Sequence, residues 1–250
     1  WIARDIAAVA AARPDAVLIP KITRTDDIRR ARAALAAAGA PKSMNIWLMI
    51  ETPAAVLNAA AIAAIAAIPE PSVTCFVFGN NDLAADLRLQ PKPGRAVLLP
   101  YISHVFLAAR AHGLAVLDGT FNDLEDRKGF RNECLQAREF GLDGKTCIHP
   151  GQVPIANETF GPDKEEVNWA RKIVEAFAAP DATGLEVMRL AGRMVERLHE
   201  RQARRTLQIA DAIAEMEEAM KEGAPSAKAP PKPSRPLVMP KARTIGEGKS

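Results

Sequence analysis

Residues 75–83 read Cys75-Phe76-Val77-Phe78-Gly79-Asn80-Asn81-Asp82-Leu83, an apolar run that passes through a glycine to a carboxylate. Aromatic and β-branched side chains fill residues 75–78 without polar alternation, which predicts a short, fully buried strand of a parallel sheet. Gly79 allows a tight turn, and Asp82 follows where the next helix is expected to begin. The pattern places a carboxylate at the carboxyl end of a buried strand.

The preceding apolar run ends in the same way. Residues 46–50 are followed by Glu51, and Thr52 and Pro53 come next. Threonine is a good N-cap and proline is favoured at the first helical position, so a helix is expected to begin at Pro53. Glutamate is a poor N-cap, so Glu51 has no capping role to explain it. Two consecutive strands are therefore predicted to end in acids.

Five strand candidates recur along the first 150 residues, centred near residues 18, 48, 77, 116 and 147, with a helical segment between neighbours. Repeated βα units of this length predict parallel strands joined by right-handed crossovers. A (β/α)8 barrel and a doubly wound sheet both satisfy the pattern, and in either fold ligands bind at the carboxyl ends of the strands. The polar residues at those ends are Lys21, Glu51, Asp82, Asp118 and His149.

The helices between the strands are expected over residues 25–38, 53–68, 95–112 and 132–140. Beyond the last strand, residues 162–178 carry apolar side chains at a spacing that buries one helix face. A longer helix is expected over residues 193–221, long enough to pack on a neighbouring subunit. Residues 224–250 contain six prolines and few large apolar groups, so this tail is expected to be disordered.

The charge of the chain is unevenly distributed. The 250 residues carry a net charge of +3, but residues 224–250 hold six basic residues against one acid and contribute +5. The rest is slightly acidic, at −2, and does not indicate a nucleic-acid-binding surface. No apolar run reaches the roughly 18 residues that a membrane helix needs. The three cysteines are odd in number and too far apart for a disulfide framework or a zinc site, so we expect a cytoplasmic protein. From the charge and the lack of a long apolar run, we expect no nucleic-acid or membrane partner.

Several motifs, in this order along the chain, resemble the citrate lyase β-subunit-like family, the HpcH/HpaI-type aldolases that include malyl-CoA and citramalyl-CoA lyases. The motifs are Ile19-Pro20-Lys21, Ile50-Glu51-Thr52, Phe78-Gly79-Asn80-Asn81-Asp82-Leu83, Asp118-Gly119-Thr120-Phe121-Asn122-Asp123 and Gly144-Lys145-Thr146-Cys147-Ile148-His149-Pro150-Gly151-Gln152. The resemblance covers roughly residues 1–222 and implies a (β/α)8 TIM barrel. It also implies that Glu51 and Asp82 bind Mg²⁺, for which Mn²⁺ can substitute.

The resemblance divides the chain into a partial barrel over residues 1–155, a helical lid or oligomerisation extension over residues 156–223, and the basic tail. Family lids bring an acidic residue onto the active site of a neighbouring subunit, which implies a homo-oligomer, a trimer or hexamer. The matching residue here is Glu196, where the family usually has aspartate. The family's first three strands, one of which carries a substrate-binding arginine, have no counterpart before Trp1.

The activity that the resemblance implies is a Mg²⁺-dependent carbon–carbon lyase. Its substrate would be a 3-hydroxyacyl-CoA, such as malyl-CoA, which gives glyoxylate and acetyl-CoA, or citramalyl-CoA. Acyl-CoA and 2-oxo acids are then the small-molecule partners. Three alternatives stay open: a malyl-CoA thioesterase, a CoA-free 2-oxo-acid aldolase, and a non-catalytic partner subunit.

Each candidate residue also has a purely structural interpretation. Asp82 can cap a helix that begins at Leu83, and Asp118 can order the turn at Gly119 instead of binding substrate. Lys21 fits a substrate-binding or Schiff-base lysine, or a salt-bridged lysine at a strand end. His149 fits a satisfied structural histidine better than a catalyst, and Glu196 fits either a solvated helix residue or a proton-transfer group.

Overall fold

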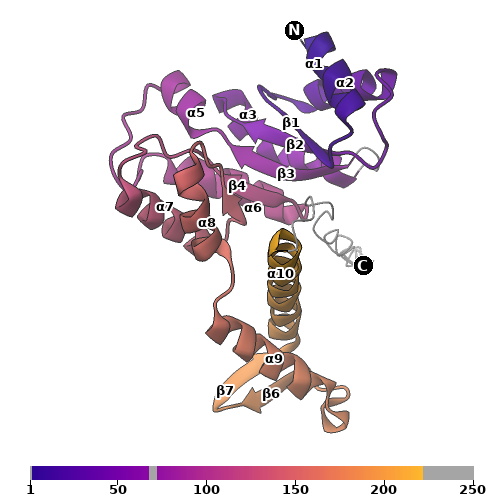
Figure 1. Ribbon diagram of the computed structural model, residues 1–250, viewed down its shortest axis with the longest axis vertical. Helices are drawn as coiled ribbons and strands as arrows, with labels where there is room; N and C mark the ends of the chain where they lie inside the picture. Colours follow the sequence, from indigo (N-terminus) through magenta and orange to yellow (C-terminus); the bar gives the residue numbers. More distant parts are fainter. Residues whose placement is uncertain (1, 68–71, 222–250) are drawn as a thin grey trace, which may run out of the picture.

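A computed structural model describes residues 2–67 and 72–221 of the chain. Its centre is a five-stranded parallel sheet in the order β1-β2-β3-β4-β5 (Figure 1). The strands are β1 (Ala16–Ile19), β2 (Asn45–Ile50), β3 (Val73–Phe78), β4 (Ala115–Asp118) and β5 (Gly144–Lys145). The predicted parallel sheet is confirmed, and every strand pairs with its neighbour in the sequence.

The helices of this sheet unit precede, connect and follow the strands. They are α1 (Ile2–Ala12), α2 (Thr25–Ala37), α3 (Pro53–Leu57), α4 (Ala59–Ala64), α5 (Asn80–Asp86), α6 (Leu99–Ala111), α7 (Arg127–Glu139) and α8 (Val153–Phe160). Short 3-10 turns lie at Ile65–Ala67 and Pro150–Gln152. Because each strand is followed by helical chain before the next, all five carboxyl ends lie at one edge of the sheet.

The main core lies between one face of the sheet and the helices that pack on it. In β2 the buried positions alternate, with Ile46, Leu48 and Ile50 fully buried and the residues between them only partly so. In β3 nearly every side chain is buried, as the unbroken apolar run predicts. Helices α2, α4 and α6 supply the opposing side chains, among them the buried Leu35, Ile62 and Val105.

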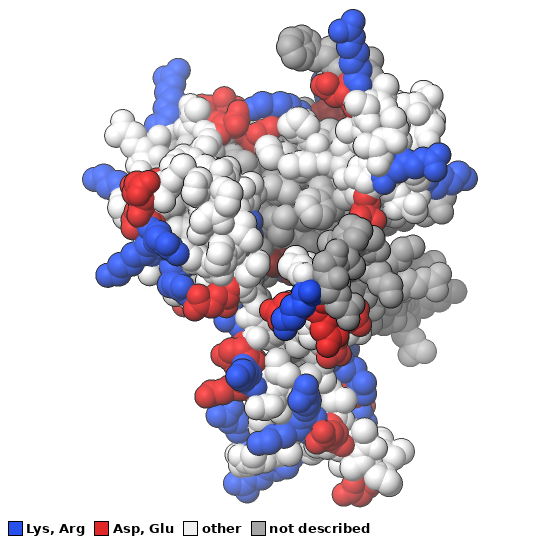
Figure 2. Space-filling model, viewed as in Figure 1, with Lys and Arg blue, Asp and Glu red and all other residues white. Residues whose placement is uncertain are grey.

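A second unit lies at the other end of the molecule (Figure 1). It consists of α9 (Lys164–Ala178), a 3-10 turn at Pro180–Ala182, an antiparallel hairpin of β6 (Val187–Leu190) and β7 (Arg193–Glu196), and α10 (Arg197–Lys221). Ala170, Ile173, Phe177, Val195 and Ala203 form its core. Figure 2 shows basic and acidic side chains interspersed over this unit, so the face in view carries charges of both signs.

Several boundaries differ from the sequence predictions. The expected helix over residues 193–221 begins only at Arg197, because residues 193–196 pair with β6, a hairpin that the predictions missed. The helix expected at 132–140 begins at Arg127, where Asp126 accepts a hydrogen bond from the Gly129 amide and caps it. The last strand has two residues instead of seven, and α1 and α8 were not expected.

The fold class is α/β with a parallel sheet and helices. The described residues give five strands of the eight that a closed barrel needs, so barrel closure stays a prediction, as does the division into a partial barrel and an extension. The disordered tail predicted over residues 224–250 lies outside the described residues. Within the part of the chain that the structure describes, every helix is too short or too polar to span a bilayer.

Candidate metal centre

Glu51 stands directly after β2 and is buried, with its side chain 3% exposed. Thr52 takes over the capping of α3, since its hydroxyl accepts a hydrogen bond from the Ala55 amide at 3.1 Å and Pro53 is the first helical residue. The capping prediction is confirmed, and it frees Glu51 from any role in the helix. Oε1 of Glu51 accepts the backbone N–H of Lys21 at 2.8 Å, which fixes the carboxylate against the end of β1.

Asp82 lies in the first turn of α5, half exposed. The interpretation that it caps a helix beginning at Leu83 is wrong, because α5 begins at Asn80 and its N-cap is Gly79. The Asp82 carboxylate instead accepts a hydrogen bond from Lys21 Nζ, which lowers the pKa of this carboxyl below its usual value. Asp82 is therefore ionised and points back across the strand ends toward β1.

Lys21 joins the two acids. Its Nζ lies 3.7 Å from Glu51 Oε2 and donates to Asp82 Oδ1, and the hydrogen bond to Asp82 raises the pKa of Lys21. The salt-bridged interpretation of this lysine is confirmed. Its backbone has φ of +55°, a left-handed conformation that costs a non-glycine residue about 1–3 kcal/mol. The Lys21 N–H bond to Glu51 helps to hold that conformation.

The three groups fit a site for a divalent cation. Both carboxylates reach one ammonium nitrogen, and together the three groups carry a net charge of −1. Among residues 2–67 and 72–221, no group of three or more His, Cys, Asp or Glu side chains could hold a metal ion. Mg²⁺ often takes only one or two protein carboxylates and completes its shell with water and substrate. Lys21 is 58% exposed on a flexible stem, so its ammonium is able to leave the carboxylates to a bound cation.

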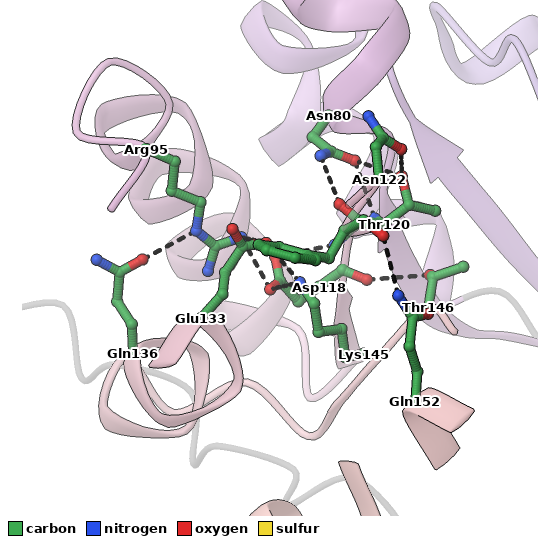
Figure 3. A network of polar contacts seen from close by, with 12 residues as sticks. Asn80, Arg95, Asp118, Thr120, Asn122, Glu133, Gln136, Lys145, Thr146 and Gln152 are labelled. Atoms are coloured by element: carbon green, nitrogen blue, oxygen red, sulfur yellow. Dashed lines mark hydrogen bonds and ion pairs between the residues drawn. The ribbon is translucent and has the colours of Figure 1, made fainter. Parts of the chain in front are cut away.

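Asp118 is buried, whereas a substrate-binding residue is expected to face an open site. Its side chain is 0% exposed and sits in a buried network with Arg95, Lys145 and Glu133 (Figure 3). Arg95 Nη1 donates to both of its oxygens, at 2.6 and 2.8 Å, and Lys145 Nζ donates to Oδ2 at 2.7 Å. Oδ1 also accepts the Gly119 amide at 2.8 Å, so the prediction that Asp118 orders this turn is confirmed.

The sequence predictions missed Arg95 and Glu133 and gave Lys145 no role. Arg95 comes from the loop before α6, Glu133 from α7 and Lys145 from β5. Gly94 and Arg95 are both left-handed, with φ of +82° and +42°, a turn that delivers the guanidinium to the network. The sequence signals for the network were Asp118 and Lys145, which lie in two of the quoted motifs, whereas Arg95 and Glu133 lie outside them.

A cavity of about 610 Å³ opens beside the network. Its walls are the start of α5, the loop over residues 91–95, the loop after β4 and one face of α7. Asn80 and Asn81 line it, whereas the two carboxylates of the candidate metal site do not. The cavity and the carboxylate pair are therefore separate spaces that share the first turn of α5.

Two further candidates lie away from this edge. His149 Nδ1 accepts the Gly151 amide at 3.0 Å and caps a 3-10 turn, which confirms its structural interpretation. Glu196 ends β7 in the second unit, where its backbone N–H donates to His199 Nδ1 at 2.9 Å. Within one copy of the chain, β7 is far from the strand ends that carry the acids (Figure 1). A role for Glu196 in a neighbouring subunit stays a prediction.

Comparisons with known proteins agree with the fold and the motifs. Residues 1–150 match the model of the HpcH/HpaI aldolase/citrate lyase family. A (3S)-malyl-CoA thioesterase of Cereibacter sphaeroides is 41% identical over 214 residues, which are 86% of this chain and 71% of that protein. An L-malyl-CoA/β-methylmalyl-CoA lyase of the same species is 29% identical over 84% of this chain and 71% of its own length.

One solved structure in this group is CitE from Mycobacterium tuberculosis, in complex with magnesium, acetoacetate and coenzyme A. It is 27% identical to this chain, with a TM-score of 0.62 over 84% of this chain and 73% of that one. The family model covers more than half of the present sequence, and the 41% identical relative matches most of it. The chain therefore belongs to the HpcH/HpaI aldolase/citrate lyase family.

Proposed function

We propose that Glu51 and Asp82 bind Mg²⁺ and that the enzyme cleaves the carbon–carbon bond of a 3-hydroxyacyl-CoA such as malyl-CoA. The observation that carries the proposal is the convergence of two carboxylates from adjacent strand ends on a single cationic group. Family members named for malyl-CoA chemistry, and a relative crystallised with magnesium and coenzyme A, support the choice of metal and substrate class.

When bound, Mg²⁺ supplies Lewis acidity to the oxygens of the 2-hydroxy acid or 2-oxo acid portion of the substrate. Glu51 is held in place by the Lys21 amide, while Asp82 approaches from the solvent side. If a cation displaced the Lys21 ammonium from the two acids, the ammonium would stay at the edge of the site, where it could bind the substrate carboxylate. The chain thus offers two ligands for the metal and one cation for the substrate.

In cleavage, the hydroxyl of malyl-CoA loses its proton and its carbon becomes the aldehyde of glyoxylate. The electrons of the breaking carbon–carbon bond pass to the carbon next to the thioester, which takes up a proton to give acetyl-CoA. A general acid or base must serve that carbon. We assign the task to Glu196 of a neighbouring copy, because among the described residues its carboxylate forms no hydrogen bond or ion pair, and the acids of its own copy are too distant.

Thioester hydrolysis is the second candidate function. The thioesterase relative is 41% identical and the lyase relative 29%, and both cover similar shares of the chain. In hydrolysis, water adds to the thioester carbonyl and the C–S bond breaks, which releases malate and the free thiol of coenzyme A. The same metal site and the same acyl portion would serve both reactions.

Product analysis with malyl-CoA separates the candidates. Cleavage produces glyoxylate, measured as its phenylhydrazone, without free thiol, whereas hydrolysis produces thiol without glyoxylate. Either activity should disappear in EDTA, return with Mg²⁺ and be lost in Glu51→Gln, while the surface control Glu158→Gln keeps it. Activity that survives EDTA and is inactivated by borohydride with substrate would instead indicate a Schiff base at Lys21. No product from either route would favour the non-catalytic partner subunit.

A further inference from the structure

We infer that Asn80 is a positioning residue for Asp82. It connects the first turn of α5 to the loop after β4 and so fixes the Asp82 carboxylate opposite Glu51. The inference rests on the proposed function, because it assumes that these two carboxylates are the metal ligands. Within the described part of the chain, the Asn80 side chain forms no hydrogen bond with either acid.

The side chain of Asn80 binds the backbone of one residue twice. Its Nδ2 donates to the Thr120 carbonyl at 2.8 Å, and its Oδ1 accepts the Thr120 amide at 2.9 Å (Figure 3). The Thr120 hydroxyl adds a third bond to Oδ1 at 3.2 Å. Two opposed bonds to the backbone of one residue define both the distance and the angle between the first turn of α5 and the loop after β4.

Helix α5 depends on such a tether. It has seven residues, and its N-cap is Gly79, which has no side chain to accept the free amides of the first turn. A helix this short is marginal without tertiary contacts. Asp82 sits in that first turn, so anything that anchors Asn80 also limits the movement of the Asp82 carboxylate.

Two glycines allow the strand ends to pack closely enough for this tether. A Cβ on Gly119 would lie 2.3 Å from Asn80 Oδ1 and 2.8 Å from the Phe78 carbonyl oxygen. A Cβ on Gly79 would lie 2.3 Å from the Glu51 Cβ. All three distances are shorter than real Cβ contacts allow. The ends of β2, β3 and β4 therefore fit against one another only because neither position has a side chain.

The far side of the tether is rigid. The Gly119 amide is bound by the buried Asp118 carboxylate, whose charge is balanced by Arg95 and Lys145. The Asp118 carbonyl oxygen also accepts the Thr146 amide at 2.9 Å. Asn80 consequently holds α5 to a segment of the strand edge that is itself tied to the buried network.

A second pair of amides provides a matched control. Asn81 and Asn122 exchange hydrogen bonds at 3.1 and 2.9 Å between the same two loops, but both side chains are solvent-exposed. Asn122→Ala removes these amide contacts and a 3.5 Å bond from the Thr120 hydroxyl, but it leaves in place both bonds between Asn80 and the Thr120 backbone. Surface substitutions of this type usually change a free energy by about 0.5 kcal/mol or less, a factor of about two in affinity.

The test measures the affinity of the full chain for Mn²⁺ by electron paramagnetic resonance, together with hydrogen–deuterium exchange of the peptide over residues 79–87. Asn80→Ala should weaken Mn²⁺ binding by about 10- to 100-fold, as loss of a supporting residue around a metal site usually does. It should also speed exchange in this peptide. Asn122→Ala should leave both within about twofold.

Asn80→Asp gives the sharpest comparison, because it adds a negative charge close to the site. If Asn80 had no positioning role, the added carboxylate would strengthen cation binding. Our inference predicts the opposite, since the donor to the Thr120 carbonyl is lost. Weaker Mn²⁺ binding by a variant that melts like the wild type supports the inference, whereas equal or tighter binding overturns it.

The other outcomes are equally decisive. If Asn80→Ala does not fold, the Mn²⁺ affinity of Asn80→Asp and its exchange rate over residues 79–87 decide whether the inference holds. If the wild-type chain binds no Mn²⁺, the proposed function fails, and the exchange data alone show whether Asn80 anchors α5. Exchange over residues 79–87 that is the same in wild type, Asn80→Asp and Asn122→Ala overturns the inference whatever the metal does.

Discussion

Asp118→Asn should destabilise the protein strongly. In the native network, two cations and two carboxylates balance, and Asp118 and Lys145 are 0% exposed while Arg95 is 4% exposed. The substitution leaves Glu133 as the one carboxylate for both cations, so the buried network keeps a net charge of +1. Removing one member of a buried ion pair costs about 3–5 kcal/mol. The free energy of unfolding of a domain is typically about 5–15 kcal/mol, so this loss would be roughly a third to a half of a stability of about 10 kcal/mol.

Urea unfolding, followed by tryptophan fluorescence, measures the loss in the free energy of unfolding. The control is Glu158→Gln, which breaks an ion pair with Arg131 whose side chains are 66% and 41% exposed. Exposed pairs contribute about 1 kcal/mol or less. The double variant Asp118→Asn with Lys145→Met removes one charge of each sign and should recover part of the stability. A loss for Asp118→Asn no larger than that for Glu158→Gln would refute the buried-charge explanation.

Three further outcomes are expected. Thr52→Ala removes the cap of α3 and should cost about 1 kcal/mol in urea unfolding, and a loss near zero would contradict the capping role. Gly79→Ala places a Cβ 2.3 Å from the Glu51 Cβ, so it should weaken Mn²⁺ binding strongly. The control Gly184→Ala, whose Cβ would meet nothing within 4 Å, should weaken it less. Equal effects of the two substitutions on Mn²⁺ affinity would contradict the packing argument. Desolvation opposes ionisation of Asp27, but hydrogen bonds from Thr23 and Arg24 lower its pKa from 3.8 to about 2. The loss of stability in Asp27→Asn should therefore be full above about pH 4 and decrease toward pH 2. A loss that does not change with pH would count against this explanation.

The sheet was largely predictable from the sequence, and the reasons are local. The apolar runs at residues 46–50 and 75–78 predict buried strands, of which the first is buried on one face and the second on both. The threonine and proline after Glu51 predict the start of a helix. These signals lie within a few residues of one another. The acid at each strand end could therefore be assigned to one edge before any coordinates were known.

The remaining features depend on contacts between distant segments. Arg95 and Asp118 are 23 residues apart, and Asn80 and Thr120 are 40 apart, so no short pattern links them. The position of Asp118 at a strand end, like that of Glu51, left both a turn-ordering and a substrate-binding interpretation open, and distant neighbours bury the side chain. The hairpin that carries Glu196 was hidden for the same reason, since residues 193–196 gain their strand character only from pairing with residues 187–190.

Titration of the wild-type chain with Mn²⁺ tests the central claim most directly. The ion that bridges Glu51 and Asp82 in the structure is the Lys21 ammonium, and our interpretation requires that a divalent cation can replace it. We predict one binding site, competed by Mg²⁺, lost in Glu51→Gln and in Asp82→Asn but retained in Glu158→Gln. Absence of binding, or a site that persists unchanged in Glu51→Gln, would show that the lysine salt bridge is the permanent state of these acids and would contradict the metal assignment.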